Sequence, residues 1–237
     1  MSTLVGRSQI WKYKWNTPQP YEKIARLQDQ WARERYQDLI PNRLLRLQHT
    51  PVVTLGRRGR TEHLRCTPDE LRNRGIDYFK ASRGGDVTYH APGQWVVYPI
   101  VELSSLNIRA RGYLYSLEEV AIKTCEDFGV QAFRVEGKNG AWTAAGKIAA
   151  IGFHIKRGIT LHGMSFNVNL DLSGFETIVP CGLLGDPVCS LQSVLHQSTP
   201  PLSAVGDALE KNFEEVFNCT LLDTNTSSES TTDDPEY

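Results

Sequence analysis

Strand-like and helix-like hydrophobic patterns alternate along the chain in no fixed order. The stretch QIWKYKW at residues 9–15 alternates apolar and polar side chains, which is typical of a strand with one buried face. Between residues 20 and 40 the apolar positions from Ile24 to Leu39 recur at helical spacing and predict an amphipathic helix. Further predicted strands cover RLLRLQHTPVVTLGRR (43–58), QWVVYPIVEL (94–103), QAFRVEG (131–137), GKIAAIGFHI (146–155) and TLHGMSFNVNL (160–170).

A short helix is predicted at TPDELRNRG, residues 67–75, from its capping residues alone. Thr67 is a suitable N-cap, and Glu70 stands three residues later, as a capping box requires. Pro68 occupies the first helical position, where its missing N–H is harmless, and Gly75 ends the helix.

Two longer helices complete the predicted elements, one over residues 115–129 with an apolar face and one over 202–217. Pro99 cannot donate to a ladder, so it predicts a bulge or an edge strand. The irregular mixture of helices and strands indicates an α+β fold with mixed sheets and flanking helices. We expect one catalytic domain at residues 1–220 and an acidic, disordered tail at 221–237.

The charge balance is uneven along the chain. The net charge is −1, but five acids and no basic residue follow Leu221: Asp223, Glu229, Asp233, Asp234 and Glu236. Removing their five negative charges leaves +4 on the part before the tail. This excess favours an acidic partner but is too small for a nucleic-acid-binding surface.

The five cysteines show no CxxC spacing, which argues against a disulfide framework and a zinc ribbon and for a reducing compartment. No apolar run reaches the roughly 18 residues of a membrane span. The first residues lack the apolar core of a signal peptide. We therefore expect a cytoplasmic protein with no membrane partner.

Several common catalytic motifs are missing. GAWTAAGKI resembles a P-loop, but five residues separate Gly140 from Gly146, and Ile148 stands where Ser or Thr must bind magnesium. There is no GxSxG, HExxH or GxGxxG. His154 and His162 lie eight residues apart, which fits no compact zinc site, so no metal is expected.

Among the cysteines, Cys181 is the strongest candidate nucleophile. It lies in TIVPCGLLG, between a proline that stiffens the chain and a glycine that lets a substrate approach the backbone. Cys125 falls on an apolar helix face, Cys66 and Cys219 flank helices, and the loop residue Cys189 is undecided. A loop cysteine is more often a bystander than a catalyst, so local sequence alone leaves the role of Cys181 open.

Lys147 could activate such a thiol. A free thiol, with a pKa near ~8.5, is mostly protonated at neutral pH and needs a neighbouring base or cation. Lys147 opens the apolar run IAAIGF, where it either snorkels from a strand end or is held inside a site. At about 4 Å from a thiolate and an effective dielectric near 20, its attraction would reach roughly 4 kcal/mol.

Three motifs together resemble the lipoyl (octanoyl) transferase family. They are RGGDVTYHAPGQWVVYPI (83–100), GKIAAIGFHIKRGITLHGMSFNVNLDL (146–172) and IVPCGLLG (178–185), and TLGRRGRTEHL (54–64) resembles the segment before the first. The resemblance runs from about residue 10 to residue 215. It implies the biotin/lipoate protein ligase-like acyltransferase fold.

The resemblance also implies a site and a reaction. Cys181 would be the nucleophile and Lys147 its activator and proton acceptor, with no cofactor and no ATP. The octanoyl group would pass from octanoyl-acyl carrier protein to Cys181, where it forms a thioester, and then to a lysine of a lipoyl domain. The lipoyl domains would be those of 2-oxoacid dehydrogenases and of the glycine cleavage H protein. The enzyme would act in protein lipoylation as a monomer. The implied acyl pocket consists of Arg83, Gly84, Gly85, Asp86, Val87, Thr88, Tyr89, His90, Ala150, Ile151, Gly152, Gly163, Met164 and Ser165.

Two other functions remain open on the sequence. An ATP-dependent lipoate or biotin ligase on the same fold would share the first motif but would leave Cys181 without a task. A non-catalytic module that binds acyl carrier or lipoyl domains would keep the pocket while tolerating changes at Lys147.

Overall fold

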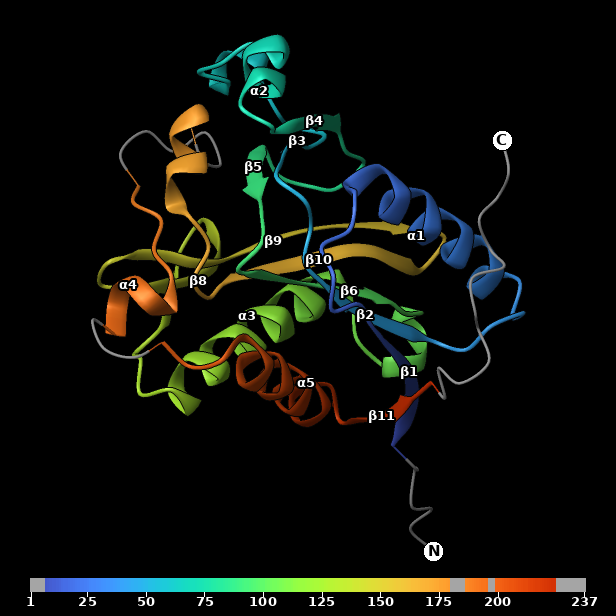
Figure 1. Ribbon diagram of the computed structural model, residues 1–237. Coiled ribbons are helices and arrows are strands. Elements are labelled where there is room, and N and C mark those ends of the chain that lie inside the picture. The colour runs from blue at the N-terminus through green and yellow to red at the C-terminus, as the bar shows by residue number, and fades with distance from the viewer. Residues whose placement is uncertain (1–6, 180–185, 196–198, 225–237) are drawn as a thin grey trace, which may run out of the picture.

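The computed structural model describes residues 7–179, 186–195 and 199–224. Its strands form two sheets (Figure 1). The large sheet contains, in spatial order, β11 (Cys219–Asp223), β1 (Ser8–Lys14), β2 (Arg43–Leu47), β6 (Gln94–Ile100), β10 (Ile159–Asn167), β9 (Gly146–Lys156), β8 (Lys138–Thr143) and β7 (Phe133–Val135). The small sheet contains β4 (Asp77–Lys80), β3 (Val52–Leu55) and β5 (Val87–His90).

Helices cover both faces of the large sheet (Figure 1). The described helices are α1 (Tyr21–Tyr36), α2 (Pro68–Asn73), α3 (Ala110–Asp127), α4 (Leu191–Leu195) and α5 (Leu202–Phe217), with 3-10 turns η1 (Thr61–His63), η2 (Leu103–Leu106) and η3 (Leu172–Thr177). Helices α3 and α5 pack side by side over the largest apolar cluster, and α1 covers a second cluster on the opposite face. The α+β fold expected from the sequence is therefore confirmed.

Helix α2 forms where its capping residues predict it. The Thr67 hydroxyl accepts a hydrogen bond from the Glu70 N–H at 3.3 Å, and the Glu70 carboxylate accepts one from the Thr67 N–H at 2.7 Å. Gly75 follows the helix with a φ of +71°, a left-handed conformation that favours glycine. This helix is thus specified locally, by residues within one turn of each end.

Pro99 does not lie at a sheet edge, so that part of the prediction is wrong. Its strand, β6, is central, and Pro99 pairs with Leu44 of β2. The pairing of β6 with β10 ends at Val97, and beyond it the Thr160 hydroxyl donates to the Pro99 carbonyl at 2.6 Å. The missing N–H of the proline therefore falls in a gap of the β6–β10 ladder, and the pairing resumes at Glu102 and Ile159.

The predicted start of the tail, at residue 221, falls inside a strand. Leu221 lies in β11, which pairs in parallel with β1 at the edge of the large sheet. Buried apolar surface and ladder hydrogen bonds hold this segment despite its place near the acidic stretch. Residues 225–237 lie outside the described residues.

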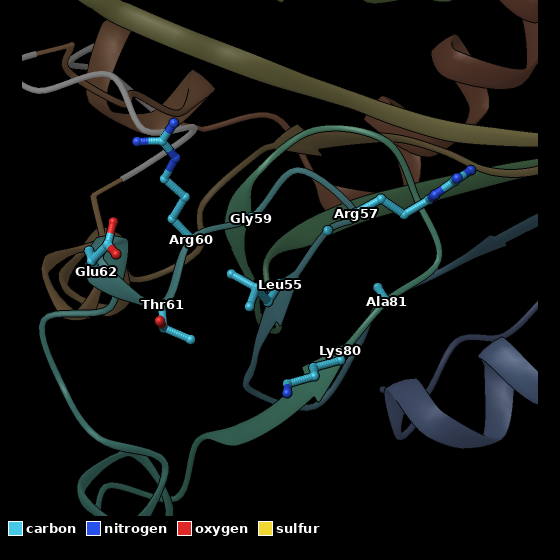
Figure 2. A pocket seen from close by; sticks show the side chains of 9 residues that line it. Leu55, Arg57, Gly59, Arg60, Thr61, Glu62, Lys80 and Ala81 are labelled. Carbon is cyan, nitrogen blue, oxygen red and sulfur yellow. The ribbon is translucent and has the colours of Figure 1, made fainter.

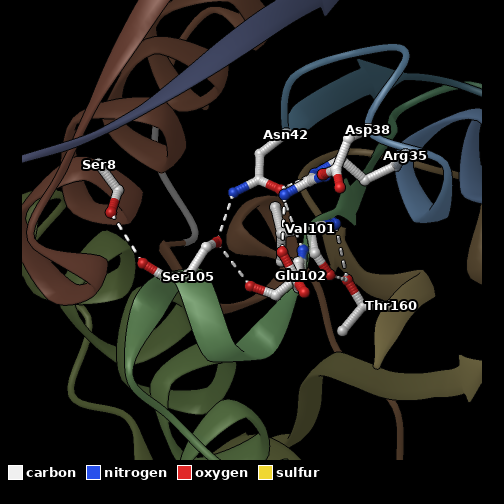
Figure 3. A network of polar contacts seen from close by, with 8 residues as sticks. All are labelled: Ser8, Arg35, Asp38, Asn42, Val101, Glu102, Ser105 and Thr160. Atoms are coloured by element: carbon white, nitrogen blue, oxygen red, sulfur yellow. Dashed lines mark hydrogen bonds and ion pairs between the residues drawn. The ribbon is translucent and has the colours of Figure 1, made fainter. Parts of the chain in front are cut away.

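A polar network joins the end of α1 to η2 (Figure 3). The Asn42 side chain accepts from Arg35 Nε at 2.9 Å and donates to Ser105 Oγ at 2.8 Å. Arg35 also binds the Glu102 carboxylate at 2.7 Å. These contacts fix α1 across one end of the large sheet. No helix in the described part of the chain is both long and apolar enough to cross a membrane.

Candidate active site

The loop that joins β4 to β5 lies on the large sheet and is held by a buried arginine. Arg83 is only 7% exposed, and its guanidinium donates to the Thr54 carbonyl at 2.6 Å and to the Thr54 hydroxyl at 2.7 Å. The Gly84 N–H donates to the Phe153 carbonyl of β9 at 2.9 Å. Arg83 therefore ties the loop to the small sheet, while Gly84 ties it to the large one.

Two paired glycines of β9 and β10 make room for this arrangement. Gly152 and Gly163 are direct partners in the ladder. A Cβ on Gly152 would lie 2.8 Å from the Gly84 carbonyl, and a Cβ on Gly163 would lie 2.3 Å from the Val97 carbonyl. The closest approaches at these glycines are between protein backbones, which only glycine permits at such distances.

A cavity opens between this loop and the centre of the large sheet, and it brings together most of the residues that the sequence predicted. Its lining includes Arg83, Gly85, Asp86, Val87, Thr88, His90, Ala150, Ile151, Gly152, Gly163, Met164 and Ser165. Of the predicted residues, Gly84 and Tyr89 are not in the lining. The Tyr89 ring packs edge-on against Phe175, because successive side chains of a strand face opposite ways.

The cavity has a volume of about 50 Å³. That is far below the several hundred Å³ of typical small-molecule sites. At this volume a small-molecule ligand could enter only if the lining moved. Met164 is the best suited of the lining residues to do so, because its unbranched side chain repacks easily.

Three buried histidines cluster at the polar side of the cavity. The rings of His49 and His90 lie 5.7 Å apart, and Tyr21 stacks near His90 at 6.0 Å and His162 at 6.5 Å. His49 donates from Nδ1 to the Gln19 carbonyl at 2.9 Å, because a carbonyl can only accept. Its Nε2 therefore accepts from the Tyr98 hydroxyl, also at 2.9 Å.

Burial keeps all three imidazoles neutral. It lowers the pKa of His49 to about 4 and that of His162 to about 3, the latter with help from the Arg83 guanidinium. Burial and the neighbouring His49 hold the pKa of His90 well below its usual value. Burial also raises the pKa of Tyr21 to about 12. His90 and His162 thus offer the cavity polar groups without charge. Within the described ranges no group of three metal-binding side chains forms.

Lys147 is buried near the start of β9 and is not a snorkelling strand end. It is 7% exposed, and its ammonium lies 4.7 Å from the centre of the Trp142 ring. Its N–H donates to the Pro187 carbonyl at 2.9 Å, and its carbonyl accepts from the Cys189 N–H at 3.0 Å. The segment 187–189 therefore runs directly beside Lys147.

The predicted nucleophile, Cys181, lies outside the described residues. The chain on either side of residues 180–185 is anchored, since the Val179 N–H donates to the His63 carbonyl at 2.7 Å and Pro187 pairs with Lys147. The structure does not test the pairing of Cys181 with Lys147, which stays a prediction.

The four described cysteines are all free thiols and all buried. Cys125 lies on the inner face of α3, as expected. Cys189, which the sequence left undecided, lies near the Thr143 hydroxyl at 3.3 Å and the Gly146 carbonyl at 3.2 Å. Burial raises the pKa of both thiols, so neither is suited to act as a thiolate.

A basic loop, residues 57–63 (Figure 2), contacts the loop between β4 and β5, residues 81–86, which we call the cavity loop. The Arg57 N–H donates to the Arg83 carbonyl at 3.0 Å, and the Arg60 N–H donates to the Asp86 carboxylate at 3.2 Å. The exposed residues Arg57, Arg60 and Lys80 line an open depression of about 600 Å³. The exposed acid Glu62 also lines this depression, so three basic residues and one acidic residue surround it.

Sequence reasoning missed several residues of the cavity and its supports. Val96, Tyr98 and His162 join the lining because β6 and β10 are neighbours in the sheet. The only sequence signal for them was the alternation within each predicted strand, which does not say which face meets the cavity.

Comparisons with known proteins identify the family of the chain. Residues 20–214 match the family model described as lipoyl protein ligase A/B catalytic domain. The chain is 41% identical over 202 residues to an octanoyltransferase of Solibacter usitatus, covering 85% of this chain and 90% of the relative. It is 45% identical over 178 residues to one of Syntrophotalea carbinolica, covering 75% and 81%.

Among solved structures, a bipartite lipoate protein ligase from Thermoplasma acidophilum superposes with a TM-score of 0.71 at 15% identity, covering 92% of this chain and 87% of that one. At this identity the superposition speaks for the fold alone, whereas the octanoyltransferases are similar in sequence over most of their length. The chain therefore belongs to the lipoyl (octanoyl) transferase family, within the lipoyl protein ligase A/B catalytic domain family.

Proposed function

We propose that this enzyme transfers an octanoyl group from octanoyl-acyl carrier protein to a lysine of lipoyl domains, through a thioester on Cys181. The observation that carries the proposal is the position of Lys147. This buried ammonium group is held beside the chain that follows the Cys181 motif, on a strand that also lines the acyl cavity. Octanoyltransferase relatives, similar over most of the chain, support the same activity.

In the first half-reaction the Cys181 thiolate attacks the thioester carbonyl of the donor. A tetrahedral oxyanion forms and collapses, the bond to the carrier sulfur breaks, and the carrier thiolate leaves. The product is an octanoyl thioester on Cys181. Because one thioester replaces another, this step is close to balanced and requires no ATP. The nearby cation Lys147 favours the thiolate form of the nucleophile.

In the second half-reaction the amine of the lipoyl-domain lysine attacks the acyl-enzyme. A carbon–nitrogen bond forms, the bond to the Cys181 sulfur breaks, and the thiolate is regenerated. The attacking nitrogen must lose one proton. In this proposal Lys147 accepts it after giving its own proton to the departing carrier thiolate in the first half-reaction. An amide is more stable than a thioester, so the transfer proceeds downhill.

The cavity supports an acyl substrate because much of its lining is apolar. Val87, Val96, Ile151 and Met164 contribute hydrophobic surface. At ~0.8 kcal/mol for each buried CH₂ group, an octanoyl chain could gain on the order of 5 kcal/mol before the cost of ordering it.

The basic loop supports an acidic, phosphate-bearing donor such as an acyl carrier protein. Arg57, Arg60 and Lys80 stand beside the depression next to the cavity loop (Figure 2). Complementary charge of this kind speeds the encounter between partners more than it tightens the final complex.

Intact mass spectrometry tests the proposal directly. After incubation with octanoyl-acyl carrier protein, we expect a single octanoyl adduct that is labile to hydroxylamine, maps to Cys181 and disappears when lipoyl domain is added. Cys181→Ser should abolish the adduct, while Cys189→Ser serves as the matched control. Activity that depends on ATP and free lipoate and survives Cys181→Ser would instead identify a ligase.

A further inference from the structure

A pair of buried amide side chains connects the cavity to the strand of Lys147. Gln94, the first residue of β6, faces Asn167, the last residue of β10, in the ladder of the large sheet. Both are almost fully buried. Gln94 Nε2 donates to Asn167 Oδ1 at 2.9 Å, and Asn167 Nδ2 donates to the Cys189 carbonyl at 2.8 Å. Because the Cys189 N–H in turn donates to the Lys147 carbonyl, the pair is connected by hydrogen bonds to the strand that carries Lys147.

Hydrogen-bond accounting fixes the orientation of both amides. The carbonyl oxygens of Cys189 and Tyr89 can only accept, so the NH₂ groups of Asn167 and Gln94 must face them, the latter at 3.3 Å. Flipping either amide would place its oxygen next to a buried carbonyl oxygen, so two hydrogen-bond acceptors would face each other. Gln94 Oε1 is therefore the atom that faces His90 Nδ1, at 2.7 Å.

This arrangement decides where His90 carries its proton. An amide oxygen is an acceptor, so His90 Nδ1 must be the donor. Burial keeps the imidazole neutral, with a pKa well below its usual value, and a neutral ring has only one N–H. The second nitrogen, Nε2, thus holds a lone pair, and His90 lines the cavity.

The chemistry of Nε2 as an acceptor selects which reacting group it can serve. A thioester carbonyl and the oxyanion derived from it are themselves acceptors, so a lone pair beside them is unfavourable. An amine offers N–H donors. We propose that Gln94 and Asn167 lock His90 with Nε2 as the hydrogen-bond acceptor for the attacking amine of the substrate lysine, so that His90 serves the second half-reaction and not the first.

The role rests on the proposed function, whereas the protonation state does not. In the amine-bound complex His90 orients the nitrogen and takes no proton. Its neighbours His49, His162 and Arg83 all oppose a positive charge there. The proton passes to Lys147, and His90 remains neutral throughout.

The protonation state can be measured on the free protein. Side-chain ¹⁵N–¹H correlation spectra at neutral pH, assigned with His90→Asn, should show a protonated Nδ1 and an unprotonated, pyridine-type Nε2. Gln94→Met should weaken this preference and give a mixture of tautomers. A wild-type His90 protonated at Nε2 would overturn the inference, whatever the enzyme does.

The half-reactions test the role. His90→Asn places an amide donor near Nδ1 and removes Nε2, so transfer to lipoyl domain should fall about 10- to 100-fold more than acylation of Cys181 does. His162→Asn, at a second cavity histidine outside the amide pair, is the matched control and should change both rates by a similar factor. Equal effects on the two rates in His90→Asn, or none, would overturn the role. A wild-type protein that forms no octanoyl adduct would instead refute the proposed function and leave the tautomer result standing.

Discussion

Gly152→Ala should show how closely the cavity loop must approach the large sheet. A Cβ at this position would lie 2.8 Å from the Gly84 carbonyl oxygen and 3.4 Å from Arg83 Cδ. Contacts of a Cβ atom shorter than 3.0 Å are essentially never observed. The loop must move by a few tenths of an ångström, against the 2.9 Å hydrogen bond from Gly84 N–H to Phe153. Overpacking of this kind costs about 1–3 kcal/mol. For a chain of this size the melting temperature should fall by roughly 2–12 °C.

The assay combines thermal unfolding with the rate of Cys181 acylation at 25 °C. Because the displaced loop lines the cavity, acylation should slow even where the protein is fully folded. Gly112→Ala in α3 is the matched control, since its Cβ would meet only Ile108 Cβ at 3.9 Å, and alanine favours a helix. A Gly152→Ala protein that melts and reacts like the Gly112→Ala control would refute the reasoning.

Three further predictions follow from the site. Lys147→Arg keeps the positive charge, but the arginine side chain stays protonated near neutral pH and cannot relay a proton. Some acylation of Cys181 should therefore persist, while transfer to lipoyl domain should fall about 100-fold or more. Equal, near-normal rates of both half-reactions would exclude the proton relay. Substituting Glu for both Arg57 and Arg60 should lower kcat/KM for octanoyl-acyl carrier protein about tenfold at low salt, but it should not lower kcat/KM for octanoyl-pantetheine. The loss with the carrier protein should become smaller as the salt concentration rises. Equal losses for both donors would argue against docking of the carrier protein at the basic loop. Unfolded His49 binds a proton below about pH 6.5, whereas folded His49 does so only near its pKa of about 4. The contribution of His49 to stability should therefore decrease by roughly 1 kcal/mol for each unit that the pH is lowered through this window, in addition to the contributions of His90 and His162. His49→Gln should reduce the slope of stability against pH in urea unfolding by about that amount, and an unchanged slope would contradict the low pKa.

Elements whose signals lie within a few residues were predictable from the sequence. Helix α5 spans Leu202–Phe217, the predicted range, because its apolar spacing is continuous. The capping box of α2 formed as expected, since Thr67 and Glu70 are one helical turn apart. Such interactions depend on local geometry and survive whatever the rest of the chain does.

The sequence also identified most of the cavity, but through the family resemblance of its motifs and not through strand patterns. The two kinds of signal disagree at Tyr89. The family motif predicted that Tyr89 lines the pocket, but side chains alternate along the strand, and its ring packs against Phe175 instead. Pro99 also departs from its prediction. A lone proline argues for an edge, yet β6 is central. The proline is tolerated there because the ladder between β6 and β10 is interrupted at that point.

Contacts between distant segments were decided by the tertiary structure alone. Tyr98 and His162 meet at the cavity only because β6 and β10 pair, and Gln94 reaches Asn167 across 73 residues of sequence. Sequence alternation gives each strand two faces, but strand order and register decide which face meets which partner. Once those are set, burial and the need to satisfy every buried polar group determine the charge of the histidines and the orientation of the amides.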